Sequence, residues 1–343
     1  MGHRAGVKPS KVNAVEKTGW PASAHEATRF ILGQLPDCSP VEGASTDAER
    51  INRAEDPPVL VEPNVIEGNS FESVFVVDPR RARTSGFAGF LDGAQDVRIV
   101  NQSGGIPIVW ATVSAAVRAR VNRRLVSWSG RPASVSRRYY IPFRYVEGMR
   151  EDLREDPRVV DTCIADSQGN FPSRHPAALM EAAVKRVQSD RERLEIELAE
   201  AWCTSEESAL YMDGSITGSA IVAASPQVIG VIKSHRRLYA EGDAFRVLVN
   251  LAPGCRTSIF EVAPRSRSAV ASWYVRLRAA SGRDALFGLV RVEAAITDDI
   301  VERAEEISSW LIAEGAPLAL PDGRWDKMAY GIRHTEEFLR AIS

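Results

Sequence analysis

Two aspartates in this sequence share the same local context. Asp92 lies in FLDGA (90–94) and Asp213 in YMDGS (211–215), so each follows a hydrophobic stretch and precedes a glycine and a small residue. A carboxylate at the end of a buried strand is held rigidly, and the glycine leaves room beside it for a metal ion and a phosphate. The alternative for each motif taken singly is an Asp-Gly pair that closes a β-turn.

Hydrophobic periodicity predicts the elements that position these acids. Strands are expected at 73–77, 87–91, 97–100 and 106–113, with a turn at 102–105 and a three-strand meander as the simplest arrangement. Between about 114 and 205 the pattern is helical, most clearly at 176–202, where apolar residues recur at spacings of three, four and seven. After this helix we expect strands at 208–212, 228–232, 245–251, 258–262, 273–277 and 287–292, then helices at 298–314 and about 326–342.

The order of the acidic residues sharpens the interpretation. A meander carrying Asp92, a long helix carrying Glu195, a strand carrying Asp213 and a final helix beginning near Asp326 deliver four acids in the order of a ribonuclease-H-like fold. We therefore predict an α/β fold: a ribonuclease-H-like mixed sheet flanked by helices, with a helical insertion at about 114–205.

The motifs resemble those of the NurA nuclease family over roughly residues 85–343. The resemblance lies in the two strand-Asp-Gly-small motifs, the helix with Arg191 and Glu195 before the second of them, and IGVIKS (229–234) after it. It implies that Asp92, Asp213 and Glu195 ligate metal, with Asp326 as the fourth ligand. Carboxylate oxygens suit Mg²⁺ or the manganese that the family uses, and two ions would promote in-line attack of water on a phosphodiester.

The resemblance also implies partners. Family members are dimers that work on DNA ends with a hexameric HerA-type ATPase, in end resection or defence against phage. This sequence has no GxxxxGK[ST] loop, so ATP hydrolysis would have to come from another chain. Whether cleavage is endonucleolytic or exonucleolytic, and with which strand polarity, is left open.

Several site residues have alternatives at this level. Glu197 competes with Glu195 as the helical ligand, and Glu195 can simply pair with Arg191. Asp326 can be a helix cap, a role compatible with metal binding, and His334 is the alternative residue to complete the site. Lys233 is expected to contact phosphate or, alternatively, to extend from a strand end into solvent, with His235 close by.

DNA contacts are predicted from a local cluster, because the net charge of −2 gives no overall basic excess. Arginines alternate with aromatic residues at 118–144, where they can hold phosphates and stack on unpaired bases, and the candidate DNA-binding residues are Arg123, Arg124, Arg137, Arg138, Lys233 and His235. A solvated helix face with core aromatics is the alternative. Arginines at 265, 267, 276 and 278 form a second basic run.

Length and composition bound the remaining choices. With 343 residues and 44% hydrophobic content, the chain suits one elaborated domain at 71–343 preceded by a partly disordered arm at 1–70. The four cysteines are scattered, without zinc-ligand spacing. The sequence has no recognisable secretion signal and no apolar run of about 20 residues, which predicts a cytoplasmic protein.

Two further hypotheses compete with a nuclease. One is a catalytically inactive ribonuclease-H-like module that binds nucleic acid or scaffolds an assembly. The other is an unrelated α/β protein with two coincidental Asp-Gly turns, which predicts that Asp92 and Asp213 lie far apart.

Overall fold

The computed structural model describes residues 19–35, 37–41, 57–82, 84–166, 168–265, 267–315 and 326–343. The fold is α/β, with a large mixed sheet flanked by helices. Part of the predicted disordered arm, residues 1–18, 36 and 42–56, lies outside the described residues.

Five strands of the sheet form its centre, in the order β8-β6-β5-β10-β11. β5 (Phe87–Ser103), β6 (Ile106–Val121) and β8 (Ser134–Ile141) are antiparallel neighbours. β10 (Ala209–Asp213) runs parallel to β5, and β11 (Val228–Ile232) runs parallel to β10. The parallel strands β5, β10 and β11 therefore point their carboxyl ends to the same side of the sheet.

Shorter strands extend the sheet at both ends. Beyond β11 lie β16 (Leu289–Ala294), β15 (Val270–Arg276), β14 (Phe260–Val262) and β13 (Cys255–Thr257). β3 (Asn64–Val65) and β4 (Ser73–Phe75) pair with β14 and β13, and β2 (Val59–Val61) pairs with β12 (Arg237–Tyr239). At the other end, β1 (Cys38–Pro40) pairs with β5, β7 (Arg124–Ser127) with β6, and β9 (Val159–Asp161) with β8.

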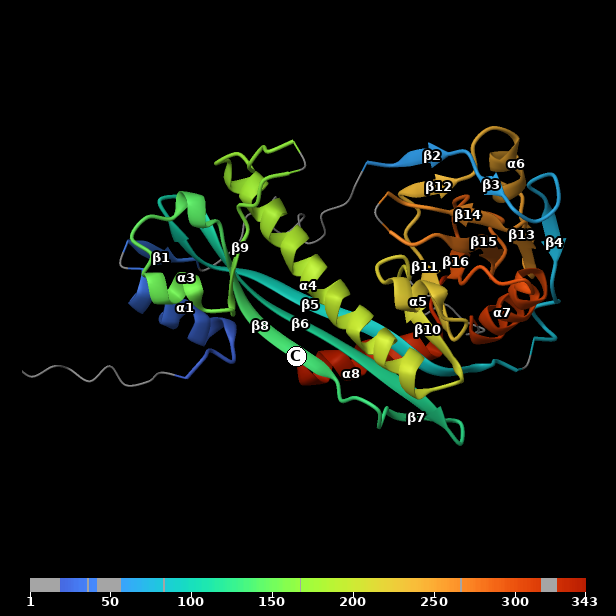
Figure 1. The fold of residues 1–343 in the computed structure, drawn as a ribbon, viewed down its shortest axis with the longest axis horizontal. Coiled ribbons are helices and arrows are strands. Elements are labelled where there is room, and N and C mark those ends of the chain that lie inside the picture. Colours follow the sequence, from blue (N-terminus) through green and yellow to red (C-terminus); the bar gives the residue numbers. More distant parts are fainter. Residues whose placement is uncertain are drawn as a thin grey trace, which may run out of the picture.

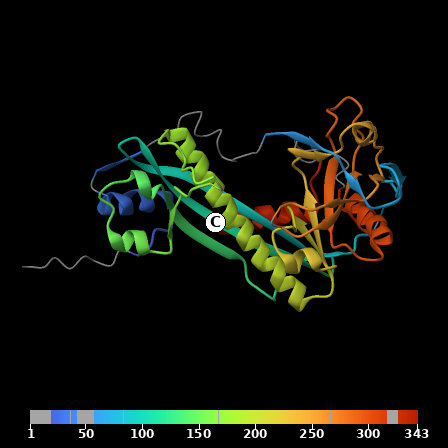
Figure 2. The same cartoon turned by 45° about the horizontal axis from the view of Figure 1, so that its top comes forward.

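Helices cover both faces of the sheet. α4 (Pro176–Ser205) crosses in front of β5 and β6, whereas α8 (Tyr330–Ile342) lies behind them (Figures 1 and 2). α5 (Ala220–Ala224) and α6 (Asp243–Val249) share the hydrophobic core of the α4 face, and α7 (Ile300–Glu314) shares that of the α8 face. α1 (Ala24–Gln34), α3 (Glu151–Glu155) and the 3-10 turn Phe143–Tyr145 pack around the far end of β5 and β6.

α4 owes its position to its sequence. Pro176 occupies the first turn, and His175 Nδ1 accepts a hydrogen bond from Ala177 N at 3.2 Å. A stripe of apolar residues then packs onto the sheet, ending in Trp202. Two acids, Asp190 and Glu195, also lie in this buried stripe. Asp190 accepts from Tyr140 Oη at 2.8 Å and pairs with Arg138 at 3.1 Å, so its burial is explained by local partners.

Several predicted elements are wrong. The strands expected at 87–91 and 97–100 are one continuous strand, β5, which runs through the Asp92-Gly93 pair without a turn. The predicted helical insertion at 114–205 contains the end of β6 together with β7, β8 and β9, and β8 is the third strand of the meander. Residues 245–251, predicted as a strand, lie mainly in α6.

Other predicted elements are confirmed. The helix at 176–202 is α4, the strands at 208–212 and 228–232 are β10 and β11, and the final helices correspond to α7 and α8. No helix of the described residues has both the length and the apolar character needed to cross a membrane.

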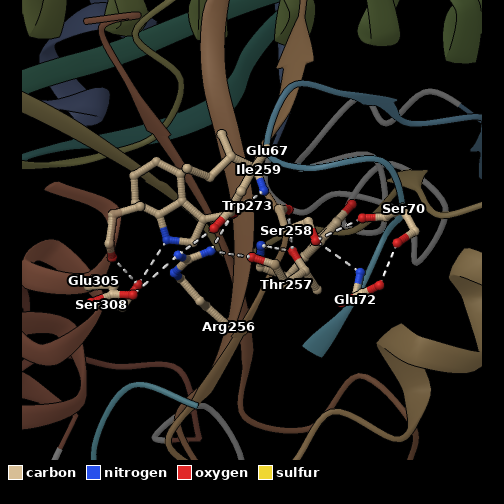
Figure 3. Close-up of polar contacts among 12 residues, drawn as sticks. Glu67, Ser70, Glu72, Arg256, Thr257, Ser258, Ile259, Trp273, Glu305 and Ser308 are labelled. Atoms are coloured by element: carbon tan, nitrogen blue, oxygen red, sulfur yellow. Dashed lines mark hydrogen bonds and ion pairs between the residues drawn. The ribbon is translucent and has the colours of Figure 1, made fainter. Parts of the chain in front are cut away.

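A buried ion pair ties residues 64–75 to the C-terminal half of the chain. The Arg256 side chain is fully buried and donates to both carboxylate oxygens of Glu67, at 2.6 and 2.8 Å (Figure 3). Glu67 also accepts from Ile259 N at 2.9 Å, and Ser258 bonds to the backbone of Ser70 and Glu72. Residues 57–70 were predicted as part of the arm, but they form β2 and β3 and belong to the folded body.

We expect Glu67→Gln to lower the free energy of unfolding by about 3 kcal/mol, because it leaves a buried guanidinium without its compensating charge. Urea unfolding followed by tryptophan fluorescence measures the change. Glu305 supplies the matched control: it lies 3.7 Å from the same guanidinium but is 55% exposed, so Glu305→Gln should change stability by less than about 1 kcal/mol. Equal effects of the two substitutions would contradict this account.

Candidate functional site

Asp92 and Asp213 lie side by side on neighbouring parallel strands. Met212 of β10 is in register with Leu91 of β5, so the next residue on each strand is one of the two aspartates. Neighbouring strands are about 4.8 Å apart. The hypothesis of two coincidental turns, which required the aspartates to be remote from each other, is therefore wrong in that expectation.

Side-chain alternation places both aspartates on the face of the sheet covered by α7 and α8. Phe90 and Tyr211 belong to the core on that face, whereas Leu91 and Met212 belong to the core on the α4 face, so Asp92 and Asp213 return to the α7–α8 side. Asp92 is only 5% exposed, and its Oδ1 accepts from Gly93 N at 2.8 Å.

Gly93 and Gly214 are both required by the local structure, for different reasons. Gly93 faces α4, where a Cβ atom would lie 2.1 Å from Glu195 Oε1. Gly214 has a φ of 145°, in the region that favours glycine, at the point where the chain leaves β10. Gly93 therefore leaves room for the carboxylate of Glu195. Of the two glycines, only Gly214 serves a turn.

Glu195 approaches the aspartates from the α4 side. It is 3% exposed, and its Oε1 accepts from Arg191 at 2.8 Å. Burial raises the pKa of Glu195 to about 7, against the charge of Arg191 and with a further contribution from Asp213.

Lys233 follows β11 and joins the same cluster. Its Nζ donates to Asp213 Oδ2 at 2.7 Å and lies 3.8 Å from Met328 Sδ. Burial by itself would lower the pKa of Lys233, but the charges of Asp213 and Asp92 outweigh it and raise the pKa, so the side chain is an ammonium ion.

A cavity of about 620 Å³ opens beside these residues, and we refer to it as the carboxylate cavity. It lies where β10 and β11 end while β5 continues, so that side chains from both faces of the sheet reach it. Its lining consists of residues 92–97 of β5, Gln188 and Arg191 of α4, Asp213 and Gly214, residues 231–234, and Glu336 and Arg340 of α8.

The pKa of Asp92 reflects this concentration of acids. Burial raises it first, the charges of Asp213, Glu195 and Glu336 raise it further, and Lys233 opposes them. Four carboxylates therefore interact around one position, from β5, β10, α4 and α8.

Glu336 was missed in the sequence, and Asp326 does not occupy its predicted place. Asp326 lies outside the carboxylate cavity, where its Oδ2 accepts from Gly288 N at 2.8 Å. Glu336 is four residues after the buried Ile332 of α8, so the helical period, applied to the acids of the last helix, would have indicated it.

The two alternative site residues also lie elsewhere. Glu197 pairs with Arg193 at 2.8 Å and with Arg131 at 3.6 Å, on the outer side of α4. His334 does not line the carboxylate cavity, and its pKa is lowered by burial and by the nearby Arg118.

The predicted DNA-binding arginines are not part of the carboxylate cavity. Arg123 and Arg124 are exposed at the β6–β7 turn, beyond the N-terminal end of β5, and do not line the cavity. Arg137 donates to the Ser343 carbonyl at 3.0 Å, and Arg138 pairs with Asp190. Tyr139 and Tyr140, expected to stack on bases, are fully buried core residues.

His235 is close to Lys233 in sequence but carries no charge at neutral pH. Burial and the nearby Lys327 lower its pKa to about 4, and its Nε2 lies 2.8 Å from the Leu289 carbonyl oxygen. This histidine is thus a neutral donor that holds the end of β11 against β16.

The carboxylate cavity fits a divalent cation in its donor type and charge. Aspartate and glutamate oxygens are the hard ligands that Mg²⁺ and Mn²⁺ prefer, and burial together with the neighbouring acids raises the pKa of Asp92 despite the charge of Lys233. As the side chains stand, no three acidic, histidine or cysteine groups of the described ranges enclose a point for an ion. Lys233 and Arg191 hold two of the carboxylates, so ion binding requires Lys233 to leave Asp213.

Comparison with known proteins adds no relative to this picture. No protein-family model matches the chain, and a search of curated proteins gave no match.

We expect the contribution of Glu195 to the stability of the metal-free protein to fall as pH rises from about 4.5 to about 7, whereas the contribution of His235, whose pKa is lowered to about 4, rises over much of the same window. Glu195 has an ordinary pKa of 4.5 when unfolded and about 7 when folded, so the folded state binds more protons in this window. Glu195→Gln mimics the protonated form and should lack this contribution. Its free energy of unfolding relative to the parent should therefore rise with pH through the window and exceed that of the parent above pH 7 by roughly 3 kcal/mol. Urea unfolding in EDTA at a series of pH values measures both.

Glu197→Gln on the outer side of α4 is the matched control and should keep the parental pH dependence. If the free energy of unfolding of Glu195→Gln depended on pH as that of the parent does, folding would not raise the pKa of Glu195, and our account would be wrong.

Proposed function

We propose that this protein is a divalent-metal-dependent nuclease of the ribonuclease-H-like type that hydrolyses DNA. One observation carries the proposal: Asp92, Asp213 and Glu336 come from three separate elements and line one cavity, and the charges of Asp213, Glu336 and Glu195, the last from α4, all act on the buried Asp92. Perturbed acids that converge in a cleft are typical of catalytic sites, because burying such charges destabilises the fold unless a ligand uses them.

The order of the elements supports the fold type in this proposal. The antiparallel β5-β6-β8 unit is followed by α4, by β10 parallel to β5, and by β11 parallel to β10. That is the order expected for a ribonuclease-H-like core, with α8 bringing the last acid. The NurA-like motifs fall on the same elements, at β5, α4, β10 and β11.

In the proposed site, Asp92, Asp213 and Glu336 hold the cation, and Glu195 adds negative charge from the α4 side. The bound ion would activate water and neutralise charge on the phosphate. Lys233 then donates to a phosphate oxygen in place of Asp213 Oδ2, and Arg191 lines the route by which the strand enters. Hydrolysis joins the water oxygen to phosphorus and breaks the bond to the leaving oxygen, which takes a proton.

A second candidate function is a nucleic-acid-binding or scaffolding module without catalysis. It is favoured by the two ion pairs that occupy the site, Lys233 with Asp213 and Arg191 with Glu195, because such pairs can neutralise the acids without any metal. The same experiment distinguishes the two functions.

We expect linear DNA to be cleaved in the presence of Mn²⁺, and Asp92→Asn or Asp213→Asn to reduce the rate at least about 100-fold, since each removes a ligand. Gel analysis of end-labelled and circular substrates measures cleavage and separates exonuclease from endonuclease activity.

Asp96→Asn is the matched control for charge at this place. Asp96 lines the same cavity but is exposed and paired with Arg98 at 2.9 Å, so its variant should cleave at nearly the parental rate. If the parent binds DNA but neither Mn²⁺ nor Mg²⁺ supports cleavage, the second candidate function is correct.

On the motif resemblance alone, we further propose a homodimer that works with a hexameric HerA-type ATPase. Co-purification of the chain with an ATPase encoded beside it, and the mass of the complex in solution, test this partnership. A monomer that ignores such an ATPase would contradict it.

A further inference from the structure

A second cavity lies on the other side of α4 from the carboxylate cavity. It has a volume of about 510 Å³ and is lined by residues of the loop that leads from β9 to α4 and of the first half of α4. We call it the loop cavity. Its lining includes Thr162, Ile164 and Phe171 from the loop and Ala182, Lys185 and Arg186 from the helix.

The loop cavity combines positive charge with unsatisfied polar groups. Among the described residues Arg186 has no ion-pair partner, and its Nε is buried without a hydrogen bond. Thr162 is 4% exposed, and its Oγ1 also has no partner among the described residues. Buried polar atoms of this kind are rare in folded proteins and destabilise them, so they indicate a ligand that supplies the partner. Lys185 is exposed beside them and adds a second cation.

The opposite part of the cavity presents an aromatic surface. Phe171 is 44% exposed, and the guanidinium of Arg144 lies 4.4 Å from its ring centroid, which fixes the ring in place. Ile164, 55% exposed, adds apolar surface next to it. The lining also contains two acids, which balance the two cations in formal charge: Asp166 accepts from the backbone of Gln168 and Asn170 within its own loop, and Glu181 is exposed.

We propose that the loop cavity binds a nucleoside 5′-monophosphate unit, with the phosphate on Arg186 and Lys185 and the base against Phe171. Arginine and lysine donate to phosphate oxygens, and the hydroxyl of Thr162 reaches the same group after a turn about its Cα–Cβ bond. The base stacks on the aromatic ring, and Glu181 accepts from a sugar hydroxyl or an amine at the mouth. The unit can be a free nucleotide or the 5′-phosphorylated end of a DNA strand. The site does not depend on the proposed nuclease activity.

Isothermal titration calorimetry of the full chain in EDTA, with dAMP as the probe, tests this site. We expect dAMP to bind and adenosine, which lacks the phosphate, to bind at least tenfold more weakly. Arg186→Leu should weaken dAMP binding at least about tenfold, and Thr162→Val and Phe171→Ala should each weaken it several-fold. Arg174→Leu, an exposed arginine near the cavity but not in its lining, is the matched control and should bind as the parent does.

Two further arms identify the source of the nucleotide and separate the two cavities. Tetradeoxyadenylate with a 5′ phosphate, compared with the same strand bearing a 5′ hydroxyl, shows whether a strand end binds in addition to the free nucleotide. Asp92→Asn should retain dAMP binding, because Asp92 lies in the carboxylate cavity. Failure of the parent to bind dAMP, or binding lost in Asp92→Asn and kept in Arg186→Leu, would overturn the proposal.

Discussion

The parallel pairing of β10 with β5 is the constraint on which the rest of the site depends. It aligns Met212 with Leu91 and so brings together two aspartates that are 121 positions apart in the sequence. Because β10 then ends and β5 continues, a gap opens in the sheet that acids from either face can approach. A shift of one residue in this pairing would turn one aspartate toward α4 and dissolve the cluster.

The cluster is electrostatically costly in the folded chain. Asp92 and Glu195 are nearly inaccessible to water, and the half-buried cations Lys233 and Arg191 oppose their negative charge. Burial of this kind is tolerated because α4 and α8 are held by extensive apolar packing. A cation that enters would reduce the repulsion among the acids, so cation binding would stabilise the folded protein.

The sequence predicted the site better than it predicted the elements around it. Asp92 and Asp213 were found because an acid directly after an apolar run is conspicuous, and Glu195 and Lys233 because the motif order placed them. β8 was missed because its polar and arginine-rich sequence, SVSRRYYI, resembles a solvated helix face, whereas its burial comes from β6, α1 and α4. α6 was predicted as a strand because its valines and phenylalanine favour strands locally, but tertiary packing of Leu248 decides the outcome. Asp326 was preferred to Glu336 because the motif order pointed to the start of the last helix, whereas the helical period from the buried Ile332 points to Glu336.

The length of β5 fixes the distance between the acids and the far end of the molecule. From Asp92 to Ser103 the strand advances by roughly 35 Å, and β6 and α4 pack along it and make this part of the molecule rigid. The end formed by α1, α3 and β9 is therefore held at a fixed distance from the acids. Under the proposed function, a polymer that contacts both this end and the acids would be held over a fixed distance, so contacts at this end would determine where along the polymer hydrolysis occurs.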